Sequence, residues 1–300
     1  MFDFQYDWHV AIYCHNEERR IAACIAAVDA AIPARRTALI TVIVNGSTDG
    51  SLAAARNSML MTRNNTVIET MPFANKSHAI NAFIHKFAVR ARLFFCVDGY
   101  VVVQPGALLA MADAVSGDIN AVAASGQSVN GRSEAALSAS TLLVGGEIRG
   151  GLYCLDPAFV SGMRSAGIRL PVGLYRGDSL LAAMARHNLD ATKPAQWSRV
   201  LGVPQATYEI DSLSLFKLTD IRRHFWRKVR QMRGRIENLA LTEIIYSKGF
   251  RALPANADQM ILDYLDHHPL PKIAMLERPF MALALRQVRP ERASKALVYL

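Results

Sequence analysis

The sequence has few cysteines, and they do not form a metal-binding or redox pattern. Its four cysteines, Cys14, Cys24, Cys96 and Cys154, are spread widely along 300 residues and include no Cys-x-x-Cys pair. None of the eight histidines has the spacing of a zinc site with a partner ligand. These absences argue against a zinc cage and a thioredoxin-type site. Cys14 and Cys96 lie in apolar runs, where a free cysteine usually packs as a small core residue.

Long hydrophobic runs are also missing. No stretch reaches the roughly 18 uncharged apolar residues that a membrane span needs. The N-terminal residues MFDFQYD are acidic and lack the positively charged start of a signal peptide. We therefore expect a soluble cytoplasmic protein and leave attachment to a membrane surface open.

Three widespread catalytic motifs are absent. No Gly-x-Gly-x-x-Gly follows the first strand-like segment, and no Gly-x-x-x-x-Gly-Lys-Ser/Thr occurs anywhere. A Gly-x-Ser-x-Gly elbow is missing as well. The dehydrogenase type of dinucleotide site, the P-loop phosphate cradle and the usual serine hydrolase arrangement are therefore disfavoured.

The composition is that of a globular protein with a positive charge. Hydrophobic residues make up 51% and charged residues 20%, which rules out a disordered or fibrous chain. The net charge of +9 favours anionic partners such as phosphorylated metabolites, nucleic acid or an acidic membrane surface. Charge alone does not choose among them.

The first half of the chain alternates strand-like and helix-like segments. The strand-like segments are residues 8–14, 39–44, 66–70, 93–97 and 119–124. The helix-like segments are residues 17–31, a helix that begins at 49 or 51, and residues 77–89 and 105–115. Such alternation predicts an α/β fold with a mostly parallel sheet and flanking helices. Ligands of such sheets bind at the carboxyl ends of the strands, here the loops 14–18, 45–49 and 98–104.

The second half of the chain is less regular. Residues 152–155 resemble a short strand, and residues 156–165, 177–187 and 257–266 look helical. Between Leu218 and Leu239, apolar side chains recur at helical spacing with basic residues around them. These segments predict a helical extension at the C-terminus.

Four motifs occur in an order known from one enzyme family. They are HNEE at residues 15–18, TVIVNGSTDGS at 41–51, NKSHAINAF at 75–83 and FFCVDGYVVVQPGAL at 94–108. In this order the sequence resembles the inverting family 2 glycosyltransferases of the GT-A fold, over residues 8 to 240 or so. The resemblance implies a Rossmann-like GT-A domain over residues 1–215. A basic helical region over residues 216–300 would pack on it.

The resemblance also implies an activity and a set of site residues. A sugar would move from a nucleotide-diphosphate sugar to a hydroxyl of a sugar, lipid or other acceptor, with inversion; no nucleic acid would take part. Asp178, in the turn 176–179, would be the base that takes the acceptor's proton. The donor would be held by Tyr13, Cys14, His15, Glu17, Asn45, Asp49, Lys76, Asp98, Gly99 and Tyr100. Lys76, Arg233 and Arg235 would hold the diphosphate, and Gly150, Gly151 and Tyr153 would border the acceptor.

At three positions the sequence departs from the family pattern. Val44 stands where the family usually has the first Asp of an Asp-Asp pair, and Gly177 stands where a Glu often precedes the base. Tyr100 replaces the second Asp of the Asp-x-Asp motif and leaves Asp98 as the one carboxylate for a divalent Mg or Mn ion. Metal dependence therefore stays open, and so does a degenerate relative that binds a nucleotide or a partner without transfer.

The segment 217–235 is the most basic part of the chain. It could close over the donor diphosphate, or lie on an anionic membrane and present the enzyme to a lipid-linked acceptor. It could also form a core helix with a solvated basic face or, as the interpretation ranked last, bind nucleic acid electrostatically. No nucleic-acid motif accompanies the charge. A nucleotidyltransferase on a similar α/β fold is a further alternative to sugar transfer.

Overall fold

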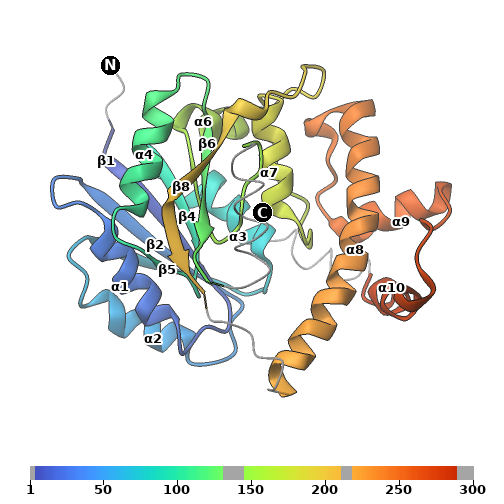
Figure 1. Cartoon of the computed structure of the whole chain (residues 1–300), viewed down its shortest axis with the longest axis horizontal. Helices are drawn as coiled ribbons and strands as arrows, with labels where there is room; N and C mark the ends of the chain where they lie inside the picture. The colour runs from blue at the N-terminus through green and yellow to red at the C-terminus, as the bar shows by residue number, and fades with distance from the viewer. Residues whose placement is uncertain (1–3, 131–144, 211–217, 289–300) are drawn as a thin grey trace.

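The computed structural model of the chain describes residues 4–130, 145–210 and 218–288 (Figure 1). The strands are β1 (Tyr6–Cys14), β2 (Ala38–Asn45), β3 (Asn65–Met71), β4 (Ala91–Asp98), β5 (Val102–Val103), β6 (Ala123–Ser128), β7 (Leu152–Leu155) and β8 (Val200–Glu209). The α-helices are α1 (Ile21–Ala31), α2 (Ser51–Met59), α3 (Lys76–Ala82), α4 (Ala107–Gly117), α6 (Pro157–Ala166), α7 (Gly177–Arg186), α8 (Leu218–Lys248), α9 (Ala257–His267) and α10 (Arg278–Arg286). Shorter helical turns are η1 (Phe83–Phe87), η2 (Trp197–Arg199), η3 (Phe250–Ala252) and η4 (Met275–Glu277).

The described strands form one eight-stranded sheet in the order β3-β2-β1-β4-β7-β6-β8-β5. The first four are parallel, as their alternation with helices predicts. Beyond β4 the sheet is mixed, because β7 runs antiparallel to both β4 and β6, while β6 and β8 are parallel. The carboxyl ends of β1, β2 and β4 therefore meet at one edge.

Helices cover both faces of the sheet, which explains why its central strands are mostly apolar on both faces. All eight residues of β2 are buried, and so are the last seven of β1. Side chains from α1, α2 and α4 pack in one cluster with one face of the sheet. Side chains from α3, α6 and α7 pack against the other face.

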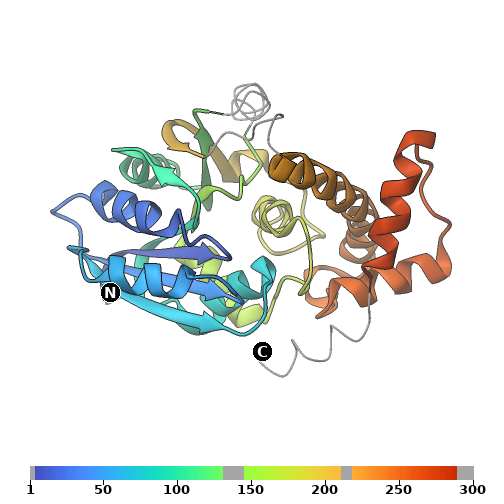
Figure 2. The same cartoon turned by 90° about the horizontal axis from the view of Figure 1, so that it is seen from below.

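The three C-terminal helices stand together at one side of the sheet (Figures 1 and 2). Val229, Met232 and Ile236 of α8 are buried and share a small apolar cluster with side chains of α9 and α10. Further along, α8 contributes Ala240 and Leu241 to the cluster beneath α7. The helical extension predicted from the apolar stripe is confirmed. The assignment of residues 1–215 and 216–300 to two units stays a prediction.

Several sequence-based boundaries were wrong. The strand expected at 119–124 is β6, which begins at Ala123, because Asp118 accepts hydrogen bonds from the backbone of Asn120 and Ala121 and forms a turn. The helix expected over 77–89 is α-helical only to Ala82 and then widens into the π-helical turn η1. Strand β8 was missed.

Candidate active site

Two loops at the carboxyl edge of the sheet are joined to each other by hydrogen bonds. The side-chain oxygen of Asn16 accepts from the backbone of Thr48 at 2.8 Å, and the Asp49 carboxylate accepts from the backbone of Glu18 at 3.2 Å. The His15 ring nitrogen Nδ1 lies 2.9 Å from the carbonyl oxygen of Asn45. His15 and Asp49 are exposed, so the predicted nucleotide loops form a fixed rim at this edge.

A second set of contacts positions Lys76. The buried Asn45 side chain accepts a hydrogen bond from the backbone of Asn75 at 3.1 Å. Asn75 in turn caps helix α3 by accepting from the backbone of His78 at 2.9 Å. Lys76 is the next residue, at the first turn of the capped helix. The end of β2 therefore fixes the position of the Lys76 backbone.

Gly46 allows this arrangement because no other residue fits there. Its φ angle is +59°, in the left-handed region that favours glycine. A Cβ at this position would lie 2.3 Å from the backbone nitrogen of Ala74. The NGSTDG turn is therefore built around a close approach to the segment that leads into Lys76.

Lys76 and Asp98 form a short ion pair at the end of β4. The Lys76 ammonium lies 2.6 Å from one Asp98 carboxylate oxygen and donates to the Gly150 carbonyl at 3.1 Å. The other Asp98 oxygen accepts from the Tyr100 hydroxyl at 2.9 Å. Burial raises the pKa of Asp98, and the nearby ammonium offsets part of this rise. Burial alone would lower the pKa of Lys76, but the carboxylates of Asp98 and Asp178 outweigh it and raise this pKa.

Asp178 and the Lys76–Asp98 ion pair both lie close to Gly150. A Cβ built on Gly150 would lie 2.4 Å from the Asp178 oxygen Oδ2 and 2.8 Å from the Lys76 nitrogen. A Cβ on Gly151 would lie 2.6 Å from the Tyr208 hydroxyl oxygen. Asp178 is in the first turn of α7, where the helix dipole favours a negative charge. Because neither glycine has a side chain, those of Asp178, Lys76 and Tyr208 can lie against the backbone at these two positions.

Lys76, Asp98 and Asp178 line a cleft of about 600 Å³. Its lining includes the predicted residues Lys76, Asp98, Tyr100, Gly150, Gly151 and Asp178. It also includes Arg149, Arg176, Arg227 and Arg230. In the described part of the lining, five basic side chains thus face two acidic ones, which suits an anionic ligand such as a diphosphate.

The sequence analysis selected other residues of the basic helix. The cleft is lined by Arg227, Arg230 and Gln231, which share one face of α8. Helical periodicity places positions 227, 230 and 231 together on one face, with 233 and 235 on either side of it. The sequence did not show which face of α8 turns toward the sheet.

Arg233 and Arg235 do not line the cleft. Arg233 lies 2.7 Å from a Glu237 oxygen and 2.6 Å from an Asp258 oxygen, with little exposure. Burial would lower the pKa of Arg233, but the two carboxylates outweigh it and raise this pKa. Arg235 lies on the surface and pairs with Glu277 at 2.7 Å. In this structure both side chains hold α8 to its neighbours.

Five other residues predicted for the site are not part of the cleft lining. Tyr13, Cys14 and Tyr153 are buried in the sheet. Gly99 donates its backbone N–H to the carbonyl of Tyr13 at 2.8 Å. Glu17 pairs with Arg20 at 3.1 Å, in the loop that leads into α1. Among the residues that the structure describes, these five therefore support the site from outside the cleft lining.

The donor set around Asp98 does not fit a divalent metal. Mg²⁺ and Mn²⁺ take several oxygen ligands, with carboxylates as the main protein contribution. Both Asp98 oxygens already face protein donors, Lys76 and Tyr100. Within residues 4–130, 145–210 and 218–288, no three His, Cys, Asp or Glu side chains gather as a metal site.

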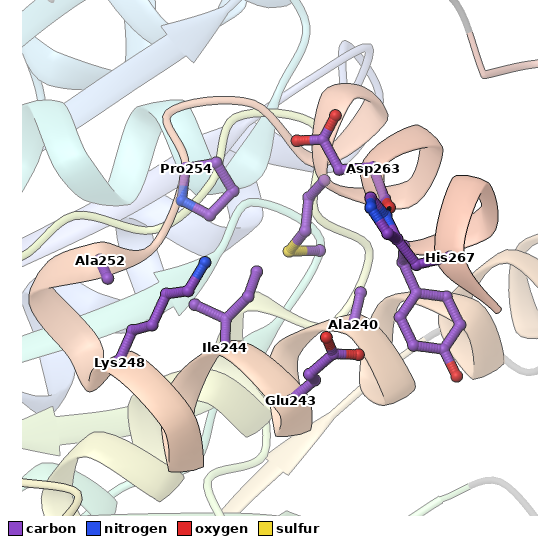
Figure 3. A pocket seen from close by; sticks show the side chains of 10 residues that line it. Ala240, Glu243, Ile244, Lys248, Ala252, Pro254, Asp263 and His267 are labelled. Atoms are coloured by element: carbon purple, nitrogen blue, oxygen red, sulfur yellow. Dashed lines mark hydrogen bonds between the residues drawn. The ribbon is translucent and has the colours of Figure 1, made fainter.

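A second cavity of about 340 Å³ lies between α8 and α9 (Figure 3). Ile244 and Met260 are part of its apolar lining, and Glu243, Lys248 and Asp263 are at its polar side. No residue predicted from the motifs lines it. The cleft at the sheet edge is therefore the candidate active site.

Comparisons with known proteins match the fold alone. No protein-family model and no curated protein sequence matches the chain. The mannosyltransferase PcManGT from Pyrobaculum calidifontis, solved with GDP-Man and Mn²⁺, superposes with a TM-score of 0.58 at 15% identity, over 96% of this chain and 83% of its own. S. aureus TarS 1–349, solved with UDP-GlcNAc, gives 0.56 at 14% identity, over 97% and 83%.

A third solved structure has the same fold. Glucosyl-3-phosphoglycerate synthase from Mycobacterium tuberculosis, in complex with phosphoglyceric acid, gives a TM-score of 0.55 at 14% identity, over 79% of this chain and 80% of its own. The chain therefore has the GT-A fold that its motifs predict, in common with these sugar-transferring enzymes.

Proposed function

We propose that this chain transfers a sugar from a nucleoside-diphosphate sugar to a hydroxyl acceptor, with inversion at the anomeric carbon. The observation that carries the proposal is the meeting of Lys76, Asp98 and Asp178 in one basic cleft at the carboxyl edge of a GT-A sheet. Solved structures with this fold support it through the donors that they contain, GDP-Man in PcManGT and UDP-GlcNAc in TarS.

Asp178 is suited to the role of general base. The acceptor oxygen would bond to the anomeric carbon while the bond from that carbon to the diphosphate oxygen breaks. The acceptor's proton would pass to the Asp178 carboxylate, and the nucleoside diphosphate would leave with the bonding electrons. Asp178 lines the cleft, so an acceptor hydroxyl that enters the cleft could approach its carboxylate.

The other parts of the site suit the donor. Negative charge grows on the diphosphate as it leaves, and donors and cations fixed in advance stabilise it most. Lys76, Arg176 and Arg230 line the cleft with such groups. The rim residues His15 and Asp49 lie where the nucleotide would extend along the sheet edge.

A donor-dependent transfer assay tests this function. The protein would be incubated with UDP- and GDP-linked sugars and an acceptor panel, and the released nucleoside diphosphate measured. Asp178→Asn should lower turnover by about 10²- to 10⁴-fold, the usual contribution of a general base. Asp190→Asn, at an exposed turn outside the cleft, is the matched control. Pyrophosphate in place of nucleoside diphosphate would identify a nucleotidyltransferase instead, and NMR of the anomeric proton reports inversion.

A lipid-linked acceptor is the second candidate, favoured by a surface on the C-terminal helices. Met275 and Leu276 are 80% and 87% exposed, and Lys272 beside them is exposed too. Glu277, the next residue, pairs with Arg235 of the basic helix α8. Exposed apolar residues flanked by cations suit an anionic membrane surface. None of the described helices is both long and apolar enough to cross a bilayer.

Vesicle co-sedimentation distinguishes this candidate. The protein should sediment with phosphatidylcholine vesicles that contain phosphatidylserine, less so at high salt because screening weakens the attraction. Met275→Ser with Leu276→Ser should abolish sedimentation. The same change at Leu60 and Met61, an equally exposed pair at the end of α2, should not. Equal sedimentation of all three proteins would contradict a membrane role for this surface.

A further inference from the structure

We propose that Lys76, in place of a divalent metal, supplies the positive charge that the donor diphosphate needs in this cleft. The inference rests on the proposed function, since it concerns the diphosphate of a nucleotide-sugar donor. It goes further in predicting that donor binding is independent of Mg²⁺ and Mn²⁺. The Mn²⁺ in the PcManGT complex shows that a structure with this fold can hold such an ion.

The first argument is the occupancy of the Asp98 carboxylate. One oxygen lies 2.6 Å from the Lys76 ammonium, and the other accepts from the Tyr100 hydroxyl at 2.9 Å. A metal at Asp98 would have to displace the ammonium or lie beside it. Like charges this close repel each other, so an ammonium held at Asp98 disfavours a divalent cation beside it. Tyr100 offers a phenol where the Asp-x-Asp motif offers a second carboxylate.

The second argument is that Lys76 is held in place from three sides. Its side chain pairs with Asp98, donates to the Gly150 carbonyl at 3.1 Å and faces Asp178 across Gly150. Its backbone begins a helix that Asn75 caps. A charge that is already oriented stabilises a leaving group without reorganisation during the reaction. The Lys76 side chain is also one-third exposed, so a ligand in the cleft can reach it.

The third argument is the charge balance of the cleft. Among the residues that the structure describes, its lining holds Lys76 and four arginines against Asp98 and Asp178. Because basic residues are in excess, the cleft favours a diphosphate and disfavours a further divalent cation. These three observations point to the same assignment: a metal-free donor site in which Lys76 is the central cation.

Calorimetry with UDP and GDP tests the assignment. Full-length protein stripped of metal would be titrated with each nucleotide in EDTA and again in Mn²⁺. We expect one nucleotide to bind with the same Kd, within about twofold, in both conditions. Lys76→Met should weaken binding by about 10- to 100-fold, as expected for loss of a charge-assisted contact. Lys76→Arg should retain most of the affinity.

Two controls keep the result interpretable. Lys228→Met removes the same charge from an exposed position of α8 outside the cleft and should leave the Kd unchanged. If Lys76→Met folds poorly because Asp98 loses its partner, the double variant with Asp98→Asn removes the unpaired carboxylate and should show the same loss of affinity. Circular dichroism reports folding for each protein.

A second readout uses Mn²⁺ itself. Electron paramagnetic resonance should detect no bound Mn²⁺ in the wild-type protein, with or without nucleotide. Combining Lys76→Met with Tyr100→Asp restores two carboxylates and removes the competing ammonium, so this variant should bind Mn²⁺.

Three outcomes would overturn the assignment. Nucleotide binding that disappears in EDTA and returns with Mn²⁺ would contradict it, as would unchanged affinity in Lys76→Met. If neither UDP nor GDP binds in any condition, the proposed function itself fails, and the assignment fails with it.

Discussion

Replacing Gly150 by alanine should damage catalysis far more than stability. The added methyl group would stand 2.4 Å from the Asp178 oxygen and 2.8 Å from the Lys76 nitrogen, closer than real contacts allow. Both atoms are the ends of side chains, so they can move away at a cost to stability of about 1 kcal/mol. A displacement of about 1 Å at a catalytic group can lower the rate about 10²-fold. We therefore expect Gly150→Ala to reduce turnover by about two orders of magnitude.

The matched control is Gly117→Ala at the end of α4. A Cβ on Gly117 would have nothing within 4 Å, and alanine favours a helix over glycine. This variant should keep full turnover and gain up to about 1 kcal/mol of stability. Steady-state rates and denaturant unfolding of both variants provide the measurement. Wild-type turnover in Gly150→Ala would show that Lys76 and Asp178 do not act together across this glycine.

Further predictions concern stability. Arg233→Met removes the guanidinium that pairs with the buried Glu237 and Asp258 and should cost about 3 to 5 kcal/mol by urea unfolding. Arg235→Met breaks a surface pair and should change the Tm little; equal effects of the two variants would contradict the account of α8. Burial, with a smaller contribution from a nearby guanidinium, lowers the pKa of His9 to about 4. The unfolded chain therefore takes up this proton first as the pH falls. The free energy of unfolding should decrease by about 3 kcal/mol between pH 6.5 and 4, and less in His9→Gln. An equal decrease in both proteins would exclude His9 as the cause.

The sequence was most informative where a segment has one consistent pattern. The apolar runs at β1, β2 and β4 predicted parallel strands, and their carboxyl ends do form the edge where Lys76 and Asp98 meet. The NGSTDG turn was singled out by its motif, and the structure adds the steric reason at Gly46. Local pattern and tertiary structure agree in this half of the chain.

The sequence was least informative where tertiary contacts determine whether a strand forms or how a helix is oriented. Strand β8 contains Gly202 and Pro204, which weaken a strand pattern, yet pairing with β6 and β5 stabilises it. The orientation of α8 depends on which face packs against α9 and α10, so the sequence could not separate Arg230, in the cleft, from Arg233, in a buried ion pair. The contact of Lys76 with Asp98 joins residues far apart in the chain and left no local signal.

The central claim is that the cleft around Lys76, Asp98 and Asp178 holds a nucleoside-diphosphate sugar. The most direct test is thermal unfolding of the full-length protein with a panel of UDP- and GDP-linked sugars. A donor at 100 times its Kd adds about 2.7 kcal/mol to the free energy of unfolding. We predict stabilisation by sugars of one nucleotide, and its decrease to between about 0.4 and 1.4 kcal/mol in Lys76→Met at the same donor concentration, as a 10- to 100-fold weaker Kd implies. No stabilisation by any nucleotide sugar, or the same stabilisation in Lys76→Met, would contradict the assignment of this cleft.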